Sequence, residues 1–169
     1  MRKKGMLLAS EVLKVVLAVI SISFLIYLLF ALYYANANEQ AKAQATEVVN
    51  RMKDIVTRLN SGVITSERIT DINPEGWNIF SYTGSERKPN LCAGENCLCI
   101  CDEVFYDNIN VFGIQLAKDR QLNECDKKGV CLAIPALSKF QDFEIKSASD
   151  GGTNILIGKN GGAIVISEA

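Results

Sequence analysis

Six cysteines provide the most reactive side chains of this sequence, and all of them fall within forty residues. They are Cys92, Cys97, Cys99, Cys101, Cys125 and Cys131. Pairs of thiols can be oxidised to disulfides, and thiolates can also hold a metal ion. An even number of cysteines in an oxidising compartment favours disulfides, here three. Zinc and iron–sulfur sites usually contain C-x-x-C pairs, which this chain lacks, so a metal site and free thiols remain the minor alternatives.

Three of these cysteines alternate along one predicted strand. Cys97, Cys99 and Cys101 would share one face of it, and Leu98 and Ile100 would point to the other face. Neighbouring positions on the same face of one strand are poorly placed to bridge each other. Fifteen connectivities are open to six cysteines, and the alternation favours those in which the strand cysteines pair with the other three.

No other group of residues indicates catalysis or a bound cofactor. The chain has no histidine, so the commonest general base and metal ligand is missing. No Ser/His/Asp set or phosphate-binding loop is present, and we expect neither an enzyme nor a cofactor. A net charge of −1 gives no basic surface for nucleic acid.

The cysteines follow a long apolar segment near the N-terminus. Residues 15–35 are uncharged, which is enough for a helix to span about 30 Å of hydrocarbon. Tyr33 and Tyr34 close the segment as an aromatic girdle, and the bases at positions 2–4 predict a cytoplasmic N-terminus. A cleaved secretory signal is disfavoured because its apolar core is usually only about 7–15 residues long. An uncleaved anchor is the plainer alternative.

Helical periodicity continues beyond the apolar segment. Apolar residues recur there at steps of three or four: Ala41, Ala45, Val48, Met52, Ile55, Val56 and Leu59. No proline or glycine interrupts residues 6–60, and Asn60, Ser61 and Gly62 supply a stop. We therefore predict one helix of about 55 residues, about 80 Å long, with an apolar first half and an amphipathic second half.

From residue 61 to residue 169 the pattern changes to a period of two. Strands are predicted at 77–82, 98–105, 143–148, 154–158 and 163–167, with an ordered connection before them and an ambiguous stretch at 106–128. Asn160-Gly161 predicts a tight hairpin turn between the last two strands. The expected fold class is α+β, with the long helix packed on a small antiparallel β-sheet head rich in cysteine.

The N-terminus also resembles a known type of leader. "RKKG" followed by a long apolar helix with an early glutamate, Glu11, resembles the class III signal peptide of archaeal type IV pilin-like proteins. The resemblance implies that a prepilin peptidase cuts after Gly5, so that residues 1–5 are a leader and Met6 is the mature N-terminus. It also implies that Glu11 meets the N-terminal amine of a neighbouring subunit during assembly. In the family the glutamate normally lies five residues beyond the glycine; here it lies six beyond.

These observations predict a structural protein. It would be a pilin or minor pilin-like subunit that crosses the cell membrane once and then assembles through its apolar helix into an extracellular filament. Its partners would be copies of itself, the prepilin peptidase, the pilus assembly machinery and the membrane. The alternative is a monomeric membrane-anchored domain that binds an extracellular ligand.

Overall fold

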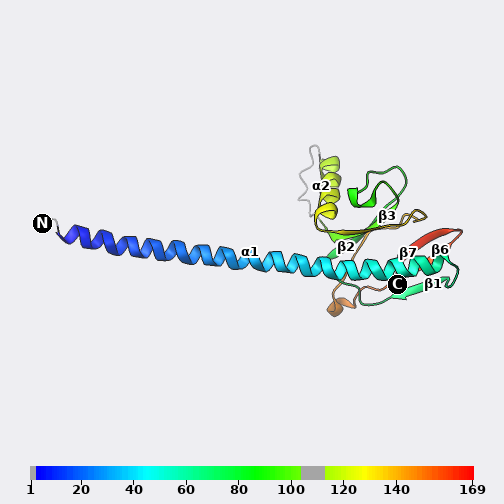
Figure 1. The fold of residues 1–169 in the computed structure, drawn as a ribbon, viewed down its shortest axis with the longest axis horizontal. Coiled ribbons are helices and arrows are strands. Elements are labelled where there is room, and N and C mark those ends of the chain that lie inside the picture. The colour runs from blue at the N-terminus through cyan, green and yellow to red at the C-terminus, as the bar shows by residue number, and fades with distance from the viewer. Residues whose placement is uncertain (1–2, 104–112) are drawn as a thin grey trace. The chain divides into compact units, whose positions relative to one another are not determined.

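The computed structural model describes residues 3–103 and 113–169, with side chains for 11–103 and 119–169. The chain divides into an N-terminal unit that ends at Glu39 and a second unit, Gln40–Ala169. The architecture is α+β, with one long N-terminal helix and antiparallel sheets (Figure 1).

Helix α1 is Lys3–Asn60. It ends at the predicted residue and begins within the segment predicted to be a leader. Its end is closed by the backbone: Val63 N–H donates to Arg58 O at 3.0 Å, and Gly62 N–H donates to Leu59 O at 3.2 Å. This pair of bonds needs a left-handed residue after the helix, and Gly62 supplies it with a φ of 75°.

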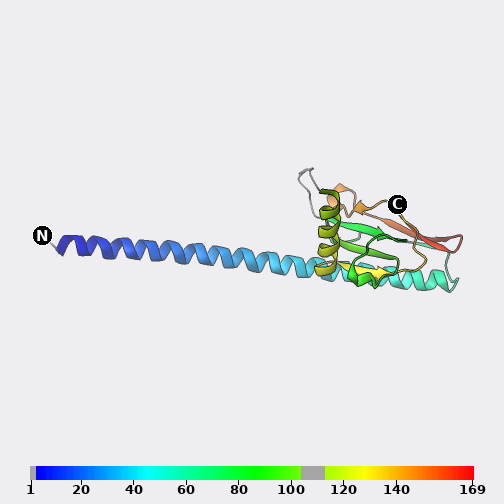
Figure 2. The ribbon, with the colours of Figure 1, turned by 90° about the horizontal axis from the view of Figure 1, so that it is seen from above.

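Two antiparallel sheets form the second unit (Figure 2). The three-stranded sheet has the order β1-β6-β7, from Ser66–Ile69, Ile155–Asn160 and Ala163–Glu168. The four-stranded sheet has the order β4-β3-β2-β5, from Val130–Ala133, Cys97–Asp102, Trp77–Tyr82 and Phe143–Glu144. The remaining elements are the helix α2 (Gly113–Lys127) and the 3₁₀ turns η1 (Asn90–Cys92) and η2 (Ala148–Asp150).

The amphipathic part of α1 packs on both sheets. Its buried stripe is Ala45, Val48, Val49, Met52, Ile55 and Leu59, which contains the predicted stripe except the half-buried Ala41 and Val56. The stripe belongs to one core cluster with isoleucines from β2, β6 and β7, such as Ile79, Ile157 and Ile166. Burial of this apolar face stabilises the helix within the head.

The four-stranded sheet separates two cores. Leu98 and Ile100 of β3 lie in the core that contains α1, whereas the β3 cysteines lie in a second cluster with Leu122 of α2. Figure 1 shows α2 on the side of this sheet opposite to α1. The period-two pattern of "CLCIC" therefore reflects a strand that is buried on both faces.

Several sequence predictions for the head were wrong. The head has two sheets rather than one. The predicted connection after α1 contains β1, and the strand predicted at 143–148 ends at Glu144. The strand predicted at 98–105 corresponds to β3, which ends at Asp102; its residues 104–105 lie outside the described residues. The ambiguous stretch contains α2, and β4 was not predicted. β1 buries only Ile69, and β4 has no alternation of buried and exposed residues, so neither carries the signal that identifies a strand.

Candidate functional site

The first unit exposes an apolar surface whose contact with water is energetically unfavourable. Large apolar side chains are exposed all round the helix between Val12 and Tyr34, from 38% at Leu28 to 69% at Tyr33. Within the described part of the chain, α1 is the one helix that is long enough and apolar enough to cross a membrane, judged by length and composition. A helix that is apolar on every face is normally covered by lipid or by other helices.

The serine side chains of this segment are satisfied within the helix. Ser21 Oγ donates to Leu17 O at 2.8 Å, and Ser23 Oγ donates to Val19 O at 2.9 Å. In an apolar surrounding an unpaired hydroxyl is costly, and these local bonds remove that cost. The two serines of residues 15–35 therefore offer no unsatisfied hydroxyl to a covering layer.

Glu11 lies at the start of the apolar segment. Its Oε1 is 3.2 Å from Lys14 Nζ, and both side chains are largely exposed. An exposed pair at this spacing on a helix contributes only a few tenths of a kcal/mol. Gly5 and Met6, predicted as the processing site, lie within the first turns of α1, where the structure describes only the backbone.

The six cysteines form three disulfides on one face of β3. The pairs are Cys92–Cys97, Cys99–Cys131 and Cys101–Cys125. Each β3 cysteine has a partner from outside the strand, in agreement with the alternation, and the three partners come from η1, β4 and α2. Cys99 and Cys131 are directly opposite in the register of β3 and β4, with Cα atoms 4.1 Å apart. The disulfides thus attach three neighbouring elements to one strand.

The Cys101–Cys125 disulfide lies in a polar and tightly packed setting. Gln121 Nε2 donates to Asp102 O at 2.8 Å and lies 3.6 Å from Cys125 Sγ. The buried Tyr82 hydroxyl is 3.8 Å from the same sulfur. A Cβ added at Gly129 would lie 2.7 Å from both Cys101 Cβ and Cys125 O, so only glycine allows the chain to pass here.

The other two disulfides touch each other. Cys92 Sγ and Cys99 Sγ are 3.7 Å apart, although they belong to different bonds. Together with Cys131 Sγ they form a group in which every sulfur lies within 4.8 Å of the others. Sequence spacing did not indicate this group, because it depends on η1 and β4 meeting on the same face of β3.

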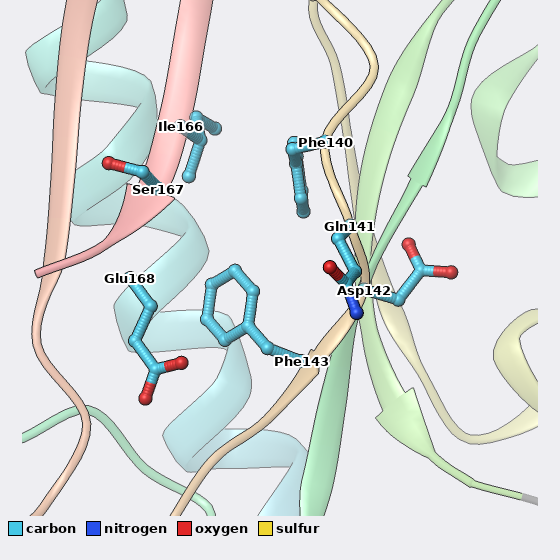
Figure 3. A pocket seen from close by; sticks show the side chains of 7 residues that line it. All are labelled: Phe140, Gln141, Asp142, Phe143, Ile166, Ser167 and Glu168. Carbon is cyan, nitrogen blue, oxygen red and sulfur yellow. The ribbon is translucent and has the colours of Figure 1, made fainter.

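A groove lies between the two sheets, where the terminal strands β5 and β7 face each other (Figure 3). It has a volume of about 320 Å³ and is lined by Phe140, Gln141, Asp142, Phe143, Ile166, Ser167 and Glu168. The Phe140 and Phe143 rings are 5.9 Å apart, and the Asp142 carboxylate turns away from them to accept a hydrogen bond from Ser81 N–H at 3.0 Å. Sequence reasoning missed the groove because its walls come from two distant segments.

No protein-family profile, curated protein or solved structure matches this chain. Its function must therefore be argued from its own residues. Two acids, an amide and a hydroxyl line the groove beside its apolar walls, but both acids are already engaged: Glu168 pairs with Lys146, and Asp142 accepts from Ser81 N–H. The groove therefore indicates no acid–base set among the described residues. The apolar helix and the cysteine-rich head are the features that bear on its function.

Proposed function

We propose that this chain is a pilin or minor pilin-like structural subunit of a type IV-like cell-surface filament. The observation that carries the proposal is the exposed apolar helix, which the same chain continues into a disulfide-bonded head. Such a helix must be covered by a membrane before assembly and by neighbouring helices after it, and a filament subunit that starts in the membrane meets both needs. Disulfides in the head fit a location outside the cell, where they persist.

The proposed route begins in the membrane. The bases at positions 2–4 hold the N-terminus in the cytoplasm, residues 15–35 cross the bilayer, and the head lies outside. A prepilin peptidase removes residues 1–5, and assembly machinery then transfers the subunit into the filament. The "RKKG" junction and the resemblance it carries support the processing step.

Glu11 is the residue proposed to direct assembly. When lipid or neighbouring helices cover the start of the helix, its carboxylate enters a medium of lower dielectric constant. There an ion pair is much stronger than in water, and an unpaired charge is much more costly. The free α-amine of Met6 on a neighbouring subunit is the proposed partner. Lys14, at 3.2 Å within the same helix, is the competing one.

The test compares two variants in cells that make filaments. Glu11→Ala protein should be made, cut and held in the membrane, but filaments should be absent or short. Lys14→Ala is the matched control, since it removes the pair within the helix and leaves the carboxylate; its filaments should be normal. Filaments of normal number and length from Glu11→Ala cells would refute the assembly role. Equal defects in both variants would indicate that Glu11 acts only through its ion pair with Lys14 in the same helix.

A second candidate is a monomeric membrane-anchored domain that binds an extracellular ligand. The groove between β5 and β7 favours it, because a concave site that combines aromatic walls with polar groups suits a small ligand. Sequencing the N-terminus of the purified protein separates the two. A chain that begins at Met6 supports the filament subunit, and one that begins at Met1 or Arg2 supports the anchored domain.

A further inference from the structure

Four sulfurs of the head gather at one point beside β3. Cys92, Cys99 and Cys131 have their sulfurs within 4.8 Å of one another, and Cys97 Sγ is bonded to Cys92 Sγ. Two of these cysteines lie on β3, one ends η1 and one lies on β4. All four side chains therefore converge from three elements that the fold already holds together.

The spacing of these sulfurs suits a metal. In a tetrahedral zinc–thiolate site each Zn–S bond is about 2.3 Å, which places neighbouring sulfurs about 3.8 Å apart. Cys92 Sγ and Cys99 Sγ, which are not bonded to each other, are already 3.7 Å apart. Reduction of the two disulfides would free their bonded sulfurs to separate by the same amount. The Cα atoms of the two pairs lie 5.7 Å and 4.1 Å apart, so short side-chain rotations suffice.

The surroundings are also those of a structural metal site. Cys92, Cys97 and Cys99 are fully buried, and Cys131 is partly exposed, so one side gives access to a cation. Thiolate ligands prefer soft or borderline cations such as Zn²⁺ over Ca²⁺ or Mg²⁺. The third disulfide, Cys101–Cys125, has its own contacts with Gln121 and Tyr82 and is not needed for a four-ligand site.

We propose that the reduced head binds one Zn²⁺ through Cys92, Cys97, Cys99 and Cys131, and that oxidation releases the ion. A dithiol reductant supplies two electrons and two protons to each disulfide, and binding of Zn²⁺ then displaces four protons from the four thiols. In the reverse direction, two molecules of a disulfide oxidant accept four electrons. The four cysteine sulfurs form two disulfides, Zn²⁺ leaves, and four oxidant thiolates are released. The site would hold η1, β3 and β4 together in a chain whose disulfides have not yet formed.

The test uses the full-length chain in detergent, reduced with a dithiol, desalted without oxygen and titrated with Co²⁺. The reduced protein should bind one Co²⁺ per chain with the absorption of a tetrahedral thiolate complex, and Zn²⁺ should displace it. The oxidised protein should bind none. Failure of the reduced protein to form a tetrahedral complex would overturn the proposal.

Paired variants assign the ligands. The Cys101→Ser/Cys125→Ser variant should keep the one-to-one complex, and the Cys92→Ser/Cys99→Ser variant should bind at least tenfold more weakly. Cys131→His should keep the stoichiometry but weaken the sulfur-to-cobalt charge-transfer band, because one nitrogen replaces one sulfur. This readout does not depend on loss of binding, so it separates a lost ligand from a lost fold. Equal binding by the two double variants, or an unchanged Cys131→His spectrum, would contradict the assignment.

Discussion

Tyr82 lies where β2 passes the Cys101–Cys125 disulfide, and only 5% of it is exposed. Burial raises the pKa of its phenol well above the usual value, and the carboxylates of Asp142 and Glu86 add to this effect. An unfolded tyrosine ionises near pH 10, whereas the folded one resists ionisation. The protonated phenol therefore supports folding fully below about pH 10, and this support is lost as the pH rises further.

We predict that the original protein loses stability at alkaline pH relative to the Tyr82→Phe variant, which has no phenol to ionise. The difference in free energy of unfolding should be constant from pH 7 to 9. It should then shift in favour of Tyr82→Phe by up to about 1.4 kcal/mol per pH unit above pH 10. Urea unfolding followed by the fluorescence of Trp77, the only tryptophan, measures it. Tyr33→Phe, at an exposed position of α1, is the control; parallel pH profiles for Tyr82→Phe and the original protein would contradict the prediction.

Gly5 is the residue whose replacement tests processing. A glycine beside the cut lets a protease approach the backbone closely. Gly5→Val should leave the protein in the membrane with residues 1–5 attached, because residues 15–35 still anchor it. Mass spectrometry of the membrane-extracted protein measures the outcome. A normally shortened protein from this variant would indicate that processing does not use this glycine.

At the scale of elements, the junction between α2 and β4 depends on Gly129. Gly129→Ala would push a methyl group against the Cys125 backbone, which cannot move aside easily. We expect a loss of about 1–3 kcal/mol, the usual range for overpacking. Gly158→Ala on β6 is the matched control, since its added Cβ meets Ser66 at 3.4 Å, and we expect a change of about 0.5 kcal/mol or less. Equal urea midpoints for the two variants would contradict the close approach.

The elements also show how far the sequence leads. The end of α1, its buried stripe and the existence of the β6–β7 hairpin were predictable, because each rests on local periodicity or turn chemistry. The predicted turn residues, Asn160 and Gly161, were one position early: Asn160 pairs with Ala163, and Gly161 and Gly162 form the turn with positive φ. β1 and β4 were not, because their short segments carry no period-two pattern and are held by their neighbours. The alternation on β3 indicated that its three cysteines pair with cysteines from outside the strand. The individual partners could not be predicted, because they depend on where η1, α2 and β4 lie in the folded head.

At the scale of the whole molecule, we predict that reduction weakens the head and leaves the N-terminal helix intact. The three disulfides close loops with separations of 5, 32 and 24 residues. Loop-closure entropy assigns about 2 kcal/mol to the shortest and about 3.5 kcal/mol to each of the others. Trp77 fluorescence should report earlier unfolding of the head in urea after reduction, while helical circular dichroism from the detergent-bound segment persists.

A thiol count on the denatured, non-reduced protein provides the control. It should be near zero, since all six cysteines are paired in the structure. Removal of the Cys99–Cys131 pair by serine substitution should cost more stability than removal of Cys92–Cys97, because its loop is longer. Six free thiols in the isolated protein would contradict the disulfide assignment as a whole.

The position of the disulfides also decides how the head would respond to mechanical tension. In a head pulled between its first and last residues, the Cys92–Cys97 and Cys99–Cys131 bonds carry the force past the chain between them. About 35 residues are thereby shielded from stretching, which removes about 120 Å from the contour length at about 3.4 Å per residue. β1, β2, β5, β6 and β7 lie outside these closed loops and can be extended fully. An oxidised head would thus extend less under load, because the disulfide-closed loops around β3 cannot be stretched out.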